Sequence, residues 1–285
     1  MGTAVPAAFS AVLAPLRAAL DSGGARGPFA SVDWGRPDPD DGLWLALDDF
    51  TTTEGLAPVV ARSAPDGERA RLAEFWAFQN VCGAPLFAAG YLFAAQRRVP
   101  WLQGNVLLHN SEWLQHVRLL EPRLWVLPDD PLCGAEGVAV VPDLQALAAT
   151  LLAEVYRTYA PIVRALRARR QTSTANAWGS VVDGLLQGFL LAGRGDGRLD
   201  AVWDLWHATI EGWGVESRRW PRRLQFDVDG EADEMVVRAA CCLIWTIPDA
   251  AGAKTPNCPN CPLDIGDAGR VRWMVEWLRS LARND

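Results

Sequence analysis

Lysine is almost absent from this chain of 285 residues. The only one is Lys254, and the 27 basic residues are outnumbered by 34 acidic ones, giving a formal net charge of −7. Proteins that bind nucleic acid usually carry a basic excess that neutralises phosphates. The composition therefore argues against a nucleic-acid partner.

Long apolar runs are also missing. The longest, from Val81 to Ala95, is shorter than the roughly 20 residues of a spanning helix and contains Pro85. The N-terminal stretch has no basic residues before its apolar part and carries Arg17 within it, which predicts an amphipathic helix and no secretory signal. We therefore expect a cytoplasmic protein without stable membrane insertion, in a compartment that keeps thiols reduced.

Motifs for nucleotides are not found either. The sequence has neither a P-loop nor a Gly-x-Gly-x-x-Gly segment after a strand, so no nucleotide or flavin site is indicated. The three histidines, His109, His116 and His207, have no partners at metal-ligand spacing, and structural roles are expected for them. Redox chemistry would therefore need electrons from another protein or a small reductant.

The hydrophobic pattern predicts an α+β fold that is mostly α-helical. Residues 105–109, 113–119 and 123–127 are short segments between turn residues and predict a small antiparallel sheet in the middle of the chain. Gly184 and Gly188 would let a neighbouring helix approach closely. Helices are expected at residues 5–21, 68–82, 86–97, 144 to about 161, 172–191, 199–213 and 267–283.

The last part of the chain differs from the rest. Residues 224–228 alternate between apolar and polar types as in a strand, and the acidic run at 227–234 is expected to be a solvated turn. We expect residues 1–222 to form a helical α+β domain, with residues 223–285 as a C-terminal segment packed on it.

Four of the six cysteines fall within 21 residues near the C-terminus, namely Cys241, Cys242, Cys258 and Cys261. A Cys-x-x-Cys turn directs two sulfurs at one centre. Four thiolates satisfy either a 2Fe–2S cluster or one tetrahedral zinc ion. The other two, Cys82 and Cys133, are isolated and are expected to be buried thiols.

The adjacent pair favours iron over zinc. A single zinc ion would have to close a strained ring over Cys241 and Cys242, whereas structural zinc sites usually space their cysteines by two to four residues. A binuclear cluster offers positions on two irons, so neighbouring cysteines are easier to place. Spacing alone favours an iron–sulfur cluster, with zinc second and a disulfide or non-metal role third.

The same segment resembles the C-terminal motif of the FhuF-like ferric-siderophore reductases. Those proteins end in a Cys-Cys pair, a variable loop and a Cys-x-x-Cys-Pro, as do Cys241-Cys242 and Cys258 to Pro262 here, although the loop at 243–257 is longer than is usual in that family. The upstream order of helices, short strands around Gly104-Asn105 and further helices is similar in outline. The resemblance implies that the four cysteines bind a 2Fe–2S cluster as the redox centre.

The resemblance also implies a function. The expected activity is one-electron reduction of ferric iron in a siderophore, hydroxamate chelates being favoured, with release of ferrous iron in the cytoplasm during iron uptake. A ferredoxin or a reductase would donate the electrons. Two alternatives use the same cysteines differently: a non-enzymatic 2Fe–2S electron carrier or sensor, and a zinc-stabilised binding protein.

A run of arginines precedes the cysteines. Arg218, Arg219, Arg222 and Arg223 could receive an anionic siderophore or an acidic electron donor, although a solvated charge run is the default interpretation. Trp245 could wall the substrate site or shield the cluster, with core packing as the alternative. These five residues are the predicted docking positions.

Overall fold

Helices dominate the structure, and the expected α+β class is confirmed. The computed structural model describes residues 6–22, 31–38, 40–63, 70–110, 114, 116–169, 172–195, 197–228, 230–243, 260–263 and 266–281. No helix within these ranges is both long enough and apolar enough to cross a bilayer. The helices are α1 (Ala7–Ser22), α2 (Thr53–Ser63), α3 (Ala70–Gln96), α4 (Leu144–Ala168), α5 (Thr174–Gly195), α6 (Leu199–Ile210) and α7 (Asp267–Leu281), with a 3-10 turn, η1 (Leu47–Thr51).

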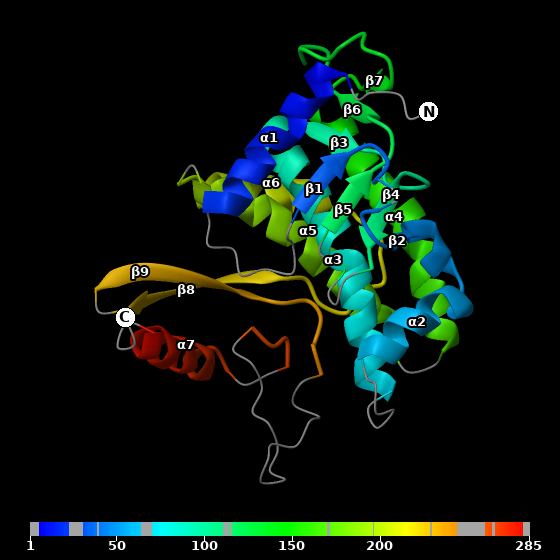
Figure 1. Ribbon diagram of the computed structural model, residues 1–285. Helices are drawn as coiled ribbons and strands as arrows, with labels where there is room; N and C mark the ends of the chain where they lie inside the picture. Colours follow the sequence, from blue (N-terminus) through cyan, green and yellow to red (C-terminus); the bar gives the residue numbers. More distant parts are fainter. Residues whose placement is uncertain are drawn as a thin grey trace.

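The core forms where α3 crosses α5 (Figure 1). A Cβ on Gly188 would lie 2.1 Å from the carbonyl oxygen of Phe87, and one on Gly90 would lie 2.2 Å from that of Leu185. The expected close approach at Gly188 is therefore confirmed, since only glycine lets the two backbones meet at this distance. Gly184 also belongs to the crossing, where Leu86 packs over it.

Pro85 and Pro161 lie inside continuous helices, although the sequence predicts a helix break near each of them. The helix α3 continues through Pro85, so the two helices predicted at 68–82 and 86–97 are one, and α4 continues through Pro161. A proline removes one backbone hydrogen bond and bends a helix, but packing can compensate for that cost. Val81, Cys82 and Leu86 around Pro85 are fully buried, so tertiary contacts hold α3 continuous there.

The middle of the chain forms two small sheets instead of the single one expected. The first has the order β1-β5-β4-β2, and the second has the order β3-β6-β7. The antiparallel pairing holds for β2–β4, β4–β5 and β3–β6, whereas β1–β5 and β6–β7 are parallel. The strands are β1 (Ser31–Trp34), β2 (Trp44–Ala46), β3 (Arg98–Pro100), β4 (Val106–His109), β5 (His116–Leu119), β6 (Leu124–Val126) and β7 (Val138–Val140).

A hairpin of β8 (Arg222–Val228) and β9 (Glu231–Val237) leads into the cysteines. The strand predicted at 224–228 is confirmed, but most of the acidic run at 227–234 belongs to the two strands and not to a turn. Figure 1 shows the hairpin and α7 together on one side of the helical body. Arg222 of β8 pairs with Asp267 of α7, which ties these two elements to each other.

Candidate metal centre

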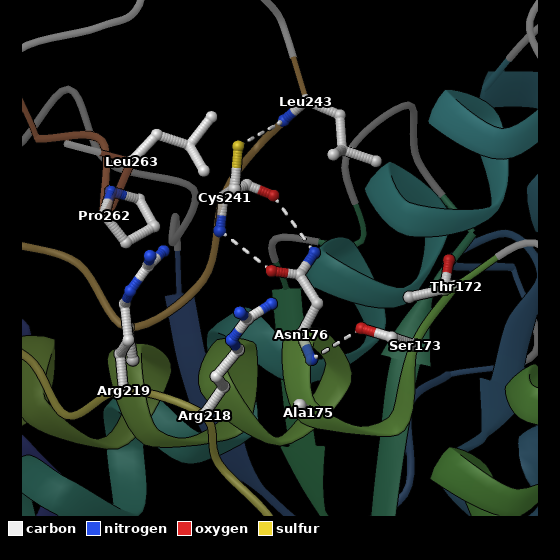
Figure 2. A pocket seen from close by; sticks show the side chains of 11 residues that line it. Thr172, Ser173, Ala175, Asn176, Arg218, Arg219, Cys241, Leu243, Pro262 and Leu263 are labelled. Atoms are coloured by element: carbon white, nitrogen blue, oxygen red, sulfur yellow. Dashed lines mark hydrogen bonds between the residues drawn. The ribbon is translucent and has the colours of Figure 1, made fainter. Parts of the chain in front are cut away.

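One face of α5 holds the backbone of the first cysteine pair. The Asn176 side chain donates from Nδ2 to the Cys241 carbonyl oxygen at 3.1 Å, and its Oδ1 accepts the Cys241 N–H at 2.9 Å (Figure 2). This two-way bond resembles one rung of a β-ladder, with a side-chain amide in place of a strand. It fixes the direction in which the Cys241 side chain leaves the backbone.

A buried carboxylate on the same face holds the residues just before Cys241. Asp183 lies two helical turns beyond Asn176 and accepts the N–H groups of Ala239 at 2.7 Å and Ala240 at 3.0 Å. Arg238 donates to it from Nε at 3.3 Å. Burial raises the pKa of Asp183, whereas Arg238 and the two N–H groups lower it. The carboxylate therefore satisfies two backbone donors that would otherwise be buried without partners.

A glycine between these two residues lets the segment lie directly on the helix. A Cβ added to Gly179 would lie 3.0 Å from the carbonyl carbon of Ala239 and 3.1 Å from the nitrogen of Ala240. Asn176, Gly179 and Asp183 follow the i, i+3, i+7 spacing of one helix face. Together these three residues form the surface of α5 on which residues 238–241 pack.

Helix α3 covers the cysteine segment from the other side. Trp76 donates from Nε1 to the Cys242 carbonyl oxygen at 3.0 Å. Leu72 and Phe75 pack with Cys241, Leu243 and Cys261 in a small apolar cluster that is separate from the main core. Water is thereby excluded from the α3 side of the cysteines.

The second cysteine turn is fastened by α7. Arg270, only 2% exposed, donates to the carbonyl oxygens of Cys261 and, at 2.7 Å, of Leu263. Asn260 donates from its side chain to the Val236 carbonyl oxygen at 3.0 Å and accepts the Arg238 N–H on its own carbonyl at 2.9 Å. The turn carrying Cys261 is thus joined both to β9 and to the first cysteine segment.

These contacts bring two of the predicted sulfurs together. The Sγ atoms of Cys241 and Cys261 are 3.9 Å apart, and the backbone N–H groups of Leu243 and Leu263 each donate to one of them at 3.4 Å. The hydrogen bond to Cys261, followed by burial, raises the pKa of the Cys241 thiol. Two buried thiols this close can form an S–H···S hydrogen bond or, as thiolates, bind one cation.

The spacing fits thiolates on a shared metal. Two ligands on a tetrahedral ion with metal–sulfur bonds of about 2.3 Å lie about 3.8 Å apart. The N–H···S bonds add donors of the kind that stabilise metal-bound sulfur. Cys241 and Cys261 therefore have the separation, the donors and the apolar surroundings of a ligand pair.

Of the other two predicted ligands, the structure describes Cys242 but not Cys258. Cys242 is half-buried, and no group of three or more metal-binding side chains occurs in the part of the chain that the structure describes. Cys258 and Trp245 lie outside the described residues. The structure thus places Cys241 and Cys261 as a pair, with Cys242 beside it on the chain.

The arginine run divides into two pairs. Arg222 binds Asp267, and Arg223 binds Asp200 and Glu234, so this pair connects β8 to its surroundings. Arg218 and Arg219 line a pocket that Cys241 also borders (Figure 2). Only this second pair is placed where it could meet a ligand next to a cysteine.

The other candidates have structural surroundings. His109 donates from Nε2 to the Asp41 carbonyl oxygen at 3.0 Å and packs against Trp44 and His116, while His207 stacks on Trp203. Cys82 is buried, as expected. The prediction for Cys133 is wrong, because this thiol is exposed in the turn before β7.

Sequence reasoning missed the residues that hold the cysteines. Asn176 and Asp183 could have been noticed as polar side chains on an otherwise apolar helix face, because their spacing of seven is that of two helical turns. Arg270 carries no comparable signal, since its burial depends on how α7 packs.

Compared with known proteins, the chain matches no family model, no curated protein and no solved structure.

Proposed function

We propose that this protein is a ferric-siderophore reductase with a 2Fe–2S cluster held by Cys241, Cys242, Cys258 and Cys261. The observation that carries the proposal is the pair of sulfurs 3.9 Å apart, seated between α3 and α5 at the edge of a pocket. The motif around these cysteines adds its resemblance to the FhuF-like reductases. Hydroxamate chelates and a cytoplasmic location belong to the same proposal.

The arrangement supports two irons over a single zinc ion. One tetrahedral ion would require all four sulfurs within about 3.8 Å of one another. Here the sulfurs of Cys241 and Cys261 are 3.9 Å apart, and the adjacent Cys242 would have to close a strained ring with Cys241 on a single ion. In the proposal Cys241 and Cys261 share one iron, which leaves Cys242 and Cys258 for the other.

The residues around the sulfurs suit a reversible redox centre. When bound, a 2Fe–2S cluster supplies one-electron transfer. The N–H groups of Leu243 and Leu263 stabilise negative charge on sulfur, and the buried guanidinium of Arg270 adds positive charge beside Cys261. Such contacts favour the reduced state, in which the site carries one more negative charge.

The proposed reaction moves a single electron. Fe(III) in the chelate gains one electron and becomes Fe(II), which its oxygen ligands hold less tightly, and a one-electron donor protein of the ferredoxin class replaces the electron. No covalent bond of the chelate is broken. The chain has to hold the chelate next to the cysteines and keep water from the α3 side.

Anaerobic purification followed by stopped-flow mixing tests the proposal. We expect a brown protein with about two irons per chain, an electron paramagnetic resonance signal after reduction, and fast reoxidation by a ferric trihydroxamate with trapping of Fe(II) by a ferrous chelator. A colourless protein with one zinc per chain would contradict the cluster. A reduced cluster that survives excess ferric chelate would leave an electron carrier or sensor and contradict the reductase.

A further inference from the structure

A pocket of about 210 Å³ opens beside Cys241, between the start of α5 and the segment that joins α6 to β8. Figure 2 shows the side chains of Arg218 and Arg219 extending from that segment toward Cys241 and Pro262. Pockets that enclose a whole small molecule usually measure about 300–1,000 Å³. This one is large enough for a single substituent of a chelate but not for the chelate itself.

Two arginines make the pocket positively charged, and no described residue of its wall compensates that charge. The described residues that line it include no carboxylate. Both arginines are exposed, and neither forms an ion pair within the described ranges. The contrast with Arg222 and Arg223, four residues further on, is direct, since each of those has an acidic partner.

The start of α5 adds to the same potential. Thr172, Ser173, Ala175 and Asn176 line the pocket, and the first turn of this 22-residue helix carries no acidic residue. A helix N-terminus of this length favours an anion. Thr172 is only 4% exposed, and its hydroxyl has no hydrogen-bond partner among the described residues, so a polar donor is available at this wall.

We infer that this pocket binds a carboxylate of the ferric chelate, so that the substrates are siderophores carrying a free carboxylate. The inference rests on the proposed function and names its substrate class. An arginine pair offers planar donor groups that match the two oxygens of a carboxylate. Because Cys241 borders the pocket, an anchored carboxylate would hold the iron end of the chelate close to the sulfurs.

Redox-inert gallium(III) chelates separate binding from electron transfer. The probes are gallium complexes of one linear trihydroxamate whose free end is either succinylated, which leaves a carboxylate, or acetylated. Isothermal titration calorimetry with the cluster-loaded full chain should show about tenfold tighter binding of the succinylated form, the size expected for charge-assisted hydrogen bonds. The preference should decrease as salt is raised, because the arginines are exposed.

Two variants locate the effect. In the double variant Arg218→Gln, Arg219→Gln, the two chelates should bind equally, with the affinity for the acetylated form unchanged. The control Arg36→Gln removes one positive charge from an exposed side chain on the loop after β1 and should keep the preference. An unchanged visible spectrum of each variant shows that the cluster site is intact.

Other outcomes overturn the inference. Equal binding of the two chelates to the wild-type chain would show that the pocket does not bind the carboxylate. A preference for the succinylated chelate that survives in the double variant would show the same. If the double variant binds both chelates normally but is reduced more slowly by an acidic ferredoxin, the arginines serve the donor instead. A preference of the predicted kind together with no oxidation by ferric chelates would keep the anion site and contradict the reductase.

Discussion

Two buried carboxylates do the same work in two regions of this protein. Glu154 of α4 accepts the N–H groups of Leu102 at 2.7 Å and Gln103 at 3.0 Å, and Arg157 pairs with it. Asp183 of α5 accepts the N–H groups of two consecutive residues in the same way, and Arg238 pairs with it. Both are almost completely buried, at 1% and 4% exposure.

The difference lies in what each carboxylate holds. The segment at Glu154 leads to Asn105, whose buried side chain bonds the backbone of Trp101 and Glu121, so the turn before β4 closes on itself. The segment held by Asp183 leads to Cys241, whose sulfur meets that of Cys261. The contacts of Glu154 therefore stabilise a turn of the fold, whereas those of Asp183 position the segment that carries the reactive side chain of Cys241.

Removing a sulfur tests the second region most severely. If the proposed 2Fe–2S cluster is present, Cys261→Ser should abolish its spectrum or alter it strongly, because one iron would lose half of its proposed protein ligands, and Cys258→Ser should do the same. The matched control is Cys133→Ser, an exposed thiol in the turn before β7. Absorption and iron content measure the outcome, and a normal spectrum in Cys261→Ser would exclude this residue as a ligand.

The carboxylates themselves give the direct comparison. Glu154→Ala and Asp183→Ala should each lower the free energy of unfolding by about 2–4 kcal/mol, since each leaves two backbone N–H groups and an arginine without their acceptor. Only Asp183→Ala should also lower the iron content of the folded protein. Denaturant titration and iron analysis check the two effects.

Equal loss of iron in both variants would break the comparison. It would mean that retention of the cluster depends on the overall stability of the fold and not on the contacts that α5 makes with residues 238–241. The measurement therefore has to be made at a temperature where both variants remain folded by circular dichroism.

Gly179 sharpens the comparison with a smaller change. In Gly179→Ala the new Cβ presses on the backbone of Ala239 and Ala240, which we expect to shift the cluster spectrum and to cost about 1–2 kcal/mol of stability. The control Gly184→Ala, on the same helix, meets the end of the Leu86 side chain at 3.3 Å and should leave the spectrum unchanged. An unaltered spectrum in Gly179→Ala would show that the segment can move off the helix without consequence.

The sequence predicted the elements better than their contacts. Apolar periodicity located α5 and α7, and the spacing of the cysteines led to the segment that holds Cys241 and Cys261. Periodicity gave no account of Pro85 inside α3, because the burial that tolerates it comes from distant residues. Nor could composition divide the four arginines, since their partners at 200, 234 and 267 are set by the pairing of β8 with β9 and by the position of α7.

The smallest expected effect belongs to the first sheet, where His116 accepts or donates a 2.9 Å hydrogen bond with Ser31. Burial lowers the pKa of His116, and the neighbouring His109 lowers it further, whereas Asp33 raises it. A histidine whose pKa is lower in the folded chain stabilises the fold above its ordinary value of 6.5 and loses that contribution as the pH falls through the lowered value. The loss of stability should be below about 1 kcal/mol because solvent screens a half-buried ring.

The variant His116→Gln tests this contribution. It should remove this part of the pH dependence of stability between pH of about 7 and 5, as measured by denaturant unfolding at each pH, without changing the cluster spectrum. A spectrum that shifts in this variant would show that the first sheet and the cysteine segment are coupled. That result would contradict the separate roles of the two regions, one stabilising the fold and the other positioning Cys241.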